Sequence, residues 1–154
     1  MAMEIFRAEP SHAALIGQLL WDFNSEFGST TTPASDFAAR FETLLEREDV
    51  LVYVSGTPDS PTGFAYFTLR PTPYFDGPLA QLEELYVVPE FRNHGLGTLL
   101  VGMAQEDLMD LDCREIHINV DEIDTDTRRF YEGLGFSNIQ PGEDYRMLCY
   151  LKEL

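Results

Sequence analysis

Basic residues are scarce in this 154-residue chain, which has 10 Lys and Arg against 27 Asp and Glu and a formal net charge of −17. Affinity for nucleic acid depends on neutralising phosphates, and binding to anionic membranes depends on basic patches, so the composition argues against both partners. Acidic clefts concentrate cations, so the charge is compatible with a cationic substrate. It is equally compatible with a simple contribution to solubility.

Cysteine and long apolar runs are also scarce. Cys113 and Cys149 form neither a CxxC pair nor a Cys/His cluster, so no metal site is expected. We expect both to act as small core residues in a reducing cytosol. No apolar stretch approaches the roughly 18 residues of a membrane span, and no signal-peptide apolar region opens the chain. The sequence therefore predicts a soluble, cytoplasmic protein.

The hydrophobic pattern predicts one mixed α/β domain over residues 1–154, without repeats or an interdomain linker. A chain of this length can bury about two-thirds of its unfolded surface, which is enough for a core. Ser11 is expected to cap the first helix, and Gly135 to end the last. The predicted order is β-α-α-β-β-β-α-β-α-β, with strands over 4–8, 50–55, 63–70, 79–88, 115–120 and 145–151 and helices over 12–27, 35–47, 95–111 and 124–134.

A glycine-containing stretch, E-F-R-N-H-G-L-G-T-L-L-V, joins a predicted strand to the helix that follows. Backbone N–H groups at a helix start have no internal partner and carry the positive end of the helix dipole. Gly95 and Gly97 remove Cβ atoms, so an anion can approach those groups. Arg92 adds a positive charge and Thr98 a hydroxyl. The stretch predicts a site for a diphosphate-sized anion, and the alternative is a plain helix start.

Two phosphate motifs do not fit this stretch. A P-loop requires a lysine directly after its second glycine, and no lysine follows Gly97. A dinucleotide fingerprint requires a third glycine where this chain has Leu100, and it opens a βαβ unit that is missing here.

Two segments resemble motifs of the GNAT acyltransferase family, which binds acetyl-coenzyme A. The piece L-Y-V-V-P-E-F-R-N-H-G-L-G-T-L-L, residues 85–100, is similar to the family's main cofactor motif. The piece R-R-F-Y-E-G-L-G-F, residues 128–136, resembles its F-Y-x-x-x-G-F segment. Strand order and helix spacing agree as well, so the resemblance covers nearly the whole chain. It implies a single mixed-sheet acyl-CoA N-acyltransferase fold.

The resemblance also implies how acetyl-coenzyme A is held. Backbone amides of the loop and helix start bind the pyrophosphate, and the pantetheine arm pairs with the edge of the preceding, bulged strand. The sequence L-E-E-L breaks strand alternation, as a bulge does. Asp124 replaces an asparagine common in the family and can cap the short helix in its place. The residues so assigned to the cofactor are Leu85, Val87, Arg92, Asn93, His94, Gly95, Leu96, Gly97, Thr98 and Asp124.

Two catalytic roles follow from the same resemblance. Tyr131 matches a tyrosine that can protonate the leaving thiolate, with packing beside Phe130 as the alternative. An alkylammonium has a pKa of ~10, so a base must deprotonate the amine. L-E-E-L-Y-V resembles spermidine/spermine acetyltransferases, where the first acid is a proposed base. Glu83 is therefore the candidate, directly or through a water, unless it is a solvated strand-end charge. Glu84 would hold the substrate cation or face solvent. Adjacent strand residues face opposite sides unless a bulge intervenes, so only one of the two acids is expected to serve the site.

In this fold the acceptor enters opposite the cofactor, beside the first two helices and the last strand. Glu26 and Phe27 are candidate substrate contacts there, because acids beside aromatics suit an organic cation. Trp21 and Phe27 are alternatively core residues. The acids and aromatics of these segments are Trp21, Asp22, Glu26, Phe27, Glu42, Glu143, Asp144 and Tyr145.

The resemblance thus predicts direct transfer of an acetyl group from acetyl-coenzyme A to a primary amine of a cationic small molecule, such as a polyamine or an aminoglycoside. Neither cysteine lies in a nucleophile motif, so no covalent enzyme intermediate is expected. The alternatives are an acetyltransferase for peptide or protein amines and a non-catalytic acyl-coenzyme A sensor. A homodimer, frequent in the family, is compatible with the chain.

Overall fold

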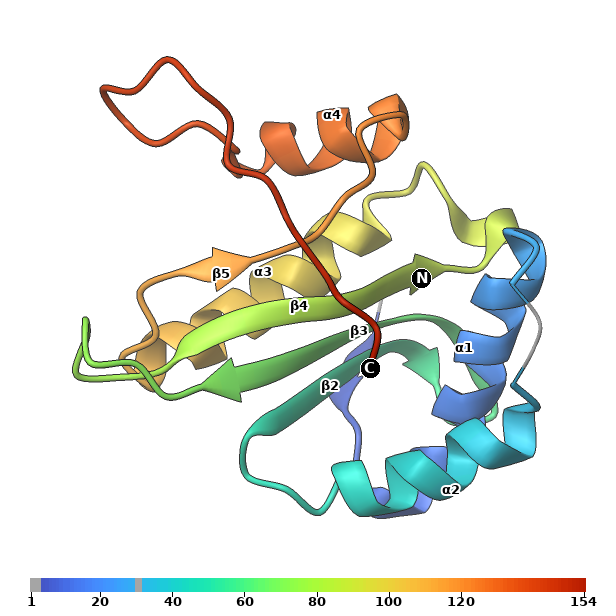
Figure 1. Cartoon of the computed structure of the whole chain (residues 1–154). Helices are drawn as coiled ribbons and strands as arrows, with labels where there is room; N and C mark the ends of the chain where they lie inside the picture. Colours follow the sequence, from blue (N-terminus) through green and yellow to red (C-terminus); the bar gives the residue numbers. More distant parts are fainter. Residues whose placement is uncertain (1–3, 30–31) are drawn as a thin grey trace. The chain divides into compact units, whose positions relative to one another are not determined.

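The computed structural model describes residues 4–29 and 32–154, and the chain divides into two compact units, Met1–His117 and Ile118–Leu154. Figure 1 labels α1 to α4 and β2 to β5. The second unit contains α4 (Thr125–Gly133). The first unit contains β1 (Ile5–Arg7), η1 (Pro10–His12), α1 (Ala13–Glu26), α2 (Ala34–Leu44), β2 (Val50–Thr57), β3 (Ser60–Arg70), β4 (Leu79–Val87), η2 (Pro89–Phe91), α3 (Leu96–Asp110) and β5 (Ile116–His117).

The five strands of the first unit form one mixed sheet in the order β1-β2-β3-β4-β5. Neighbouring strands are antiparallel, except that β5 runs parallel to β4. The predicted α/β class with a mixed sheet is therefore confirmed. Side chains alternate across a strand, so the fully apolar run of β2 supplies both faces of the sheet.

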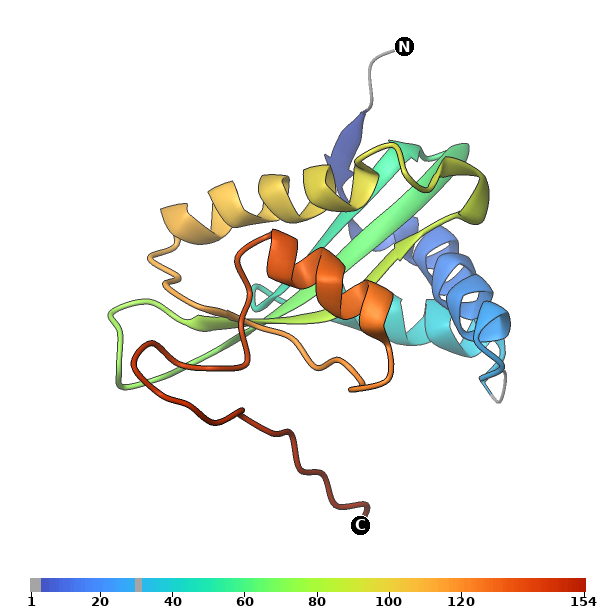
Figure 2. The ribbon, with the colours of Figure 1, turned by 90° about the horizontal axis from the view of Figure 1, so that it is seen from above.

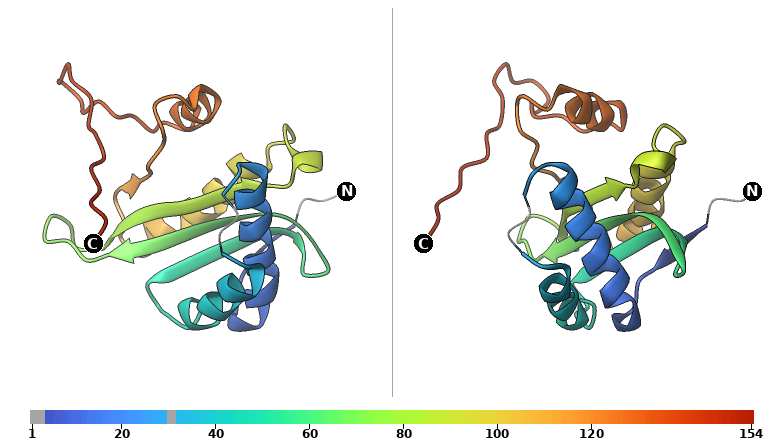
Figure 3. Two further views of the ribbon diagram at one scale, coloured as in Figure 1. Left: turned by 45° about the vertical axis from the view of Figure 1, so that its right-hand side comes forward. Right: turned by 90° about the vertical axis from the view of Figure 1, so that its right-hand side faces the viewer.

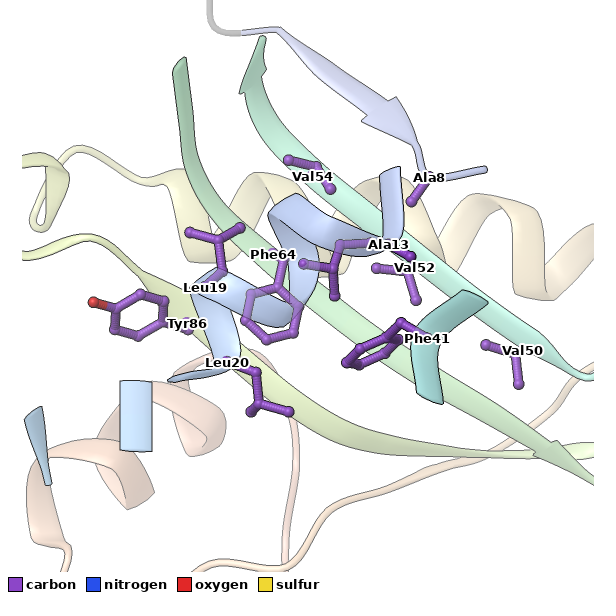
Figure 4. Packing of buried hydrophobic residues seen from close by; sticks show 11 residues of the cluster. Ala8, Ala13, Leu19, Leu20, Phe41, Val50, Val52, Val54, Phe64 and Tyr86 are labelled. Atoms are coloured by element: carbon purple, nitrogen blue, oxygen red, sulfur yellow. The ribbon is translucent and has the colours of Figure 1, made fainter. Parts of the chain in front are cut away.

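Helices cover both faces of this sheet, with α1 and α2 on one face and α3 on the other (Figure 2). Val50, Val52 and Val54 of β2 join the core under α1 and α2, where they meet Ile16 and Phe41 (Figure 4). On the opposite face, the Tyr53 hydroxyl donates a 2.6 Å hydrogen bond to Asp107 of α3. Burial of these apolar side chains is the main force that holds the helices on the sheet.

The two N-terminal helices pack directly against each other (Figure 3). Gly17 of α1 permits this approach, because a Cβ atom there would stand 2.6 Å from the backbone nitrogen of Ala38 in α2. A real Cβ is not tolerated at that distance, so this glycine sets how close the helices lie.

Several predicted local features differ from the structure. Ser11 lies inside η1 and caps nothing; Glu9 and His12 form a reciprocal capping pair instead. Residues 145–151 are not a strand, because no neighbouring strand pairs with them in the described part of the chain, and a strand needs a ladder partner. The predicted strand over 115–120 contracts to β5 for the same reason. Cys113 is buried as expected, but Cys149 is exposed.

No helix within residues 4–29 and 32–154 is both long and apolar enough to cross a membrane. Over the same residues, no group of three or more His, Cys, Asp or Glu side chains is arranged to hold a metal ion.

Candidate active site

Strand β4 carries a bulge at the acidic pair. Tyr66 of β3 pairs with Glu84, but the next residue, Phe67, pairs with Leu82, so Glu83 is the extra residue. A bulge places two residues of one strand opposite one residue of its partner and interrupts the alternation of side chains. The irregularity indicated by L-E-E-L is therefore present at the acidic pair.

The bulge brings both carboxylates to the face covered by α1 and α2. Glu84 lies opposite Tyr66, whose ring contacts Phe41 of α2 at 5.5 Å between centroids. Glu83 Oε1 accepts a 2.8 Å hydrogen bond from the hydroxyl of Thr68, which lies two residues from Tyr66 and so on the same face. Adjacent residues of a regular strand could not share a face in this way.

The two carboxylates differ in their surroundings. Glu83 is exposed, whereas Glu84 is half-buried. Burial, followed by the nearby negative charge of Glu83, raises the pKa of Glu84 from 4.5 to about 7. Burial and the same two carboxylates also raise the pKa of Tyr66. Glu84 is therefore the group that changes charge near neutral pH, as a general base must.

Beyond β5, the edge of β4 pairs with no other strand among residues 4–29 and 32–154. In the described residues, β5 pairs with β4 at Ala80 and Gln81 and no further. The N–H of Val88 donates to Thr62 of β3 at 2.9 Å. Because backbone groups alternate in direction along an antiparallel ladder, those of Leu85 and Val87 point away from β3 toward this edge. Leu85 thus has the backbone direction that pairing with a pantetheine arm requires, whereas the Val87 carbonyl already accepts from Arg92.

The loop before α3 turns through two left-handed residues, Asn93 with φ 64° and Gly95 with φ 80°. Gly95 is the N-cap of α3, and no side chain caps this end of the helix. A Cβ at Gly95 would meet nothing within 4 Å, so the space beside it is open. Burial of Leu96 and Leu100 fixes the helix against the sheet. The first-turn N–H groups are therefore presented as an anion site requires.

Arg92, immediately before Asn93, is held by neighbouring protein groups. Its two terminal nitrogens donate to the two carboxylate oxygens of Glu26, each at 2.7 Å, and its Nε donates to the carbonyl of Val87 at 2.8 Å. The guanidinium also lies 5.6 Å from the ring centroid of Tyr86. Glu26 and Arg92, assigned by the sequence to different ligands, therefore contact each other.

An aromatic group at the C-terminal end of α1 lies next to this ion pair. Phe27 is 65% exposed and meets Phe23 edge-on at 5.4 Å, while Phe23 stacks on Tyr86 at 5.0 Å. Tyr86 follows Glu84 by two residues on β4 and lies on the same face. The exposed Phe27 ring is thus connected, through Phe23 and the buried Tyr86, to the strand face that carries Glu84.

Tyr131 lies in the second unit, where the end of α4 fixes it. Gly135 adopts φ 96°, and the N–H groups of Gly135 and Phe136 bond back to Glu132 and Tyr131 at 3.0 Å. This pattern is a Schellman motif, and its usual apolar contact is the Tyr131–Phe136 ring pair at 5.5 Å. Phe130 contacts Tyr131 on another side at 5.2 Å. The F-Y-x-x-x-G-F spacing thus encodes a helix end that orients a tyrosine.

The other candidate residues are distributed over both units. At the start of α4, the Asp124 side chain accepts from the N–H of Thr127, which confirms the predicted cap. His94 and Thr98 are exposed, Trp21 is half-buried, and Glu42 is exposed on α2. Glu143, Asp144 and Tyr145 belong to the second unit and are exposed.

The structure adds four residues to the predicted site: Tyr66, Thr68, Tyr86 and Phe23. Tyr66 lies on β3 opposite Glu84, and Thr68 on the same strand reaches Glu83 through its hydroxyl. Both contacts depend on strand register, which no local pattern specifies. Tyr86 could have been found, because it belongs to the quoted cofactor motif and alternates with Glu84.

The acetyltransferase (GNAT) family model matches residues 15–136. The chain belongs to this family. The predicted family and fold are confirmed, and the chain is an acetyl-coenzyme A-dependent N-acetyltransferase, as expected.

Similar proteins agree with this assignment. Aminoglycoside N(6')-acetyltransferase type 1 of Salmonella typhimurium is 25% identical over 112 residues, which are 70% of this chain and 77% of that protein. A candidate acetyltransferase from Arthrobacter sp. FB24 is 43% identical, with a TM-score of 0.90 and 98% and 96% of the two chains covered. AAC(6')-Iy, in complex with a bisubstrate analogue, CoA-S-monomethyl-acetylneamine, shares the fold at 22% identity and a TM-score of 0.77, covering 97% and 100%.

Proposed function

We propose that this GNAT enzyme acetylates a primary amine of a cationic small molecule, with aminoglycosides as the first acceptors to test. The observation that carries the proposal is the β4 bulge, which brings Glu83 and Glu84 to one face beside Tyr86. Paired carboxylates attract an ammonium group by charge. The similarity to aminoglycoside N-acetyltransferases supports this choice over polyamines.

Glu84 is the proposed general base in place of Glu83. Its pKa of about 7 lets it accept a proton near neutral pH and then release it to solvent. Glu83 is tied to Thr68, and its negative charge adds to burial, which is the main cause of the raised pKa of Glu84. Division of labour between two neighbouring carboxyl groups is a recurrent way to obtain a base that works near pH 7.

The proposed reaction is a direct transfer. The ammonium gives a proton to the Glu84 carboxylate, and the neutral amine attacks the thioester carbonyl. The new C–N bond forms as the C–S bond breaks, and the leaving thiolate takes the hydroxyl proton of Tyr131. The amide nitrogen then releases its second proton to solvent, and the Tyr131 phenolate is reprotonated from solvent. No residue of the enzyme becomes acylated in this scheme.

The chain's own groups suit the cosubstrate. The first-turn N–H groups of α3, from Gly95 to Thr98, are proposed to bind the diphosphate of coenzyme A, because no side chain caps them. The backbone of Leu85 on the open edge of β4 is proposed to pair with the pantetheine amides, as an added strand would.

The proposal is tested by release of free thiol from acetyl-coenzyme A. The full-length enzyme is incubated with neamine, spermidine, a peptide with a free N-terminal amine, or no amine. We expect release with neamine that depends on Glu84 and is about a hundredfold slower in Glu84→Gln, the lower end of what a general base contributes. If thiol is released with the peptide and with neither small molecule, the acceptor is a peptide or protein amine. Tight binding of acetyl-coenzyme A without thiol release in the presence of any amine would indicate a sensor.

A further inference from the structure

Arg92 connects the cofactor loop to α1, which is 66 residues earlier in the chain. Its guanidinium forms a two-pronged ion pair with Glu26, the last residue of α1, and its Nε binds the carbonyl of Val87 at the end of β4. Two parallel N–H···O bonds fix both the distance and the orientation of the partners, which a single contact cannot do. Arg92 therefore joins the end of α1 to the end of β4.

The pair leaves Arg92 poorly placed to bind a phosphate. The side chains of Arg92 and Glu26 are 36% and 28% exposed, so the pair is only partly shielded from water. Glu26 nevertheless neutralises the guanidinium at short range and takes one N–H of each terminal nitrogen. A diphosphate would meet a guanidinium already neutralised by this carboxylate, whereas the α3 amides have no side-chain cap to displace.

The segment that the pair holds is the one with exposed aromatic surface. Glu26 immediately precedes Phe27, and Phe23 lies one turn earlier on α1, stacked on Tyr86. Arg92 itself lies over the other part of this cluster, 5.6 Å from the Tyr86 ring centroid. Since Tyr86 is two residues from Glu84 on the same strand face, movement of the end of α1 would change the surface beside the proposed base.

We propose that Arg92 is a positioning residue that acts through Glu26: it holds the end of α1 against β4 and so shapes the amine-binding surface, and it is not a ligand of the coenzyme A diphosphate. The inference rests on the proposed function for the location of the amine. It reassigns Glu26 as well, from a direct partner of the substrate cation to the anchor of Arg92.

A double-mutant cycle tests this inference. The variants are Arg92→Met, Glu26→Gln, the two together, and Arg92→Lys; the readouts are the acetyl-coenzyme A Kd by calorimetry and the amine KM and kcat by thiol release. We expect each single variant to raise the amine KM about tenfold, as loss of a charge-assisted pair implies, and the acetyl-coenzyme A Kd to stay within about threefold. The double variant should be no worse than either single one. Arg92→Lys should recover little, because a lysine cannot make the two-pronged contact.

Other outcomes would overturn the inference. An Arg92→Met variant that binds acetyl-coenzyme A about tenfold more weakly, beside a normal Glu26→Gln, would make Arg92 a phosphate ligand. A further rise in amine KM when Glu26→Gln is added to Arg92→Met would make Glu26 a direct substrate contact. If the acetyl-coenzyme A Kd and the amine KM and kcat are unchanged in every variant, the ion pair contributes to neither binding nor catalysis. Arg114→Met, which removes an exposed pair with Asp112, is the matched control and should change neither constant.

Amide hydrogen exchange keeps the test independent of the acceptor. If no amine supports thiol release, the proposed function fails, but Arg92 can still be examined. Both single variants should then speed exchange at the last turn of α1 while α2 keeps its protection, because the end of α1 loses the same ion pair in both variants. Unchanged exchange there would refute the positioning role itself.

Discussion

Replacement of Glu84 by glutamine should slow catalysis and stabilise the protein at the same time. The carboxyl group has a pKa of about 7 in the folded chain against an ordinary value of 4.5, chiefly because it is half-buried and secondly because Glu83 is close. At about 1.4 kcal/mol for each pKa unit, ionised Glu84 costs at most about 3 kcal/mol of folding free energy. Glutamine keeps the shape of the side chain and removes that cost.

The sign of the effect follows from linkage. The pKa of Glu84 is higher in the folded chain than in the unfolded one, so protonation of Glu84 favours the folded state. This contribution to the unfolding free energy is complete below pH 4.5 and is lost as the pH rises through about 7. Wild type and Glu84→Gln should therefore have similar unfolding free energies at about pH 4, and the variant should be more stable by up to about 3 kcal/mol at about pH 8. Urea denaturation at a series of pH values measures this difference.

Catalysis supplies the second half of the test. The ratio of wild-type to Glu84→Gln kcat/KM should rise through about pH 7 and then level, because only the ionised carboxylate accepts a proton. Taking the ratio cancels the ionisation of the amine itself. A Glu84→Gln variant with turnover within about twofold of wild type, and no pH-dependent gain in stability, would refute the reasoning.

Glu83→Gln is the matched control for this experiment. It removes a carboxylate one residue away on the same face, which the structure ties to Thr68. Loss of its charge should lower the pKa of Glu84 and move the midpoint of the rate profile to lower pH, with the plateau rate largely kept. If Glu83→Gln loses the plateau rate of the pH profile while Glu84→Gln stays active, Glu83 is the base.

Three further predictions concern other parts of the enzyme. Tyr131→Phe should lower kcat about a hundredfold with acetyl-coenzyme A affinity nearly kept, as loss of a general acid does, and pre-steady-state thiol release measures it. Gly95→Ala should cost about 1 kcal/mol in unfolding free energy, because φ is 80° there, and should weaken acetyl-coenzyme A binding in calorimetry, since the methyl group enters the open space by the α3 amides. Tyr53→Phe should lower the unfolding free energy by about 2 kcal/mol in urea, through loss of its bond to Asp107, with the amine KM unchanged.

The sequence by itself determined the features that depend on local backbone conformation. Gly95 and Gly135 stand where the chain turns through φ values of 80° and 96°, and both mark helix ends that residue type alone predicts. The run of apolar residues in β2 and the helical spacing in α1 likewise indicated their elements. Local signals failed at residues 145–151, because a strand exists only where a neighbour completes its hydrogen bonds.

Tertiary structure alone decided which residues of the candidate site meet. The register of β3 against β4 makes Glu83 the bulged residue and sets both acids on the face of α1 and α2. Packing there, and not residue type, separates two adjacent glutamates into an exposed one and one with a pKa of about 7. Arg92 and Glu26 are far apart in the chain, and a sequence with 27 Asp and Glu offers many other partners for one arginine. Register and burial are properties of contacts between distant segments, so they arise only when the chain has folded.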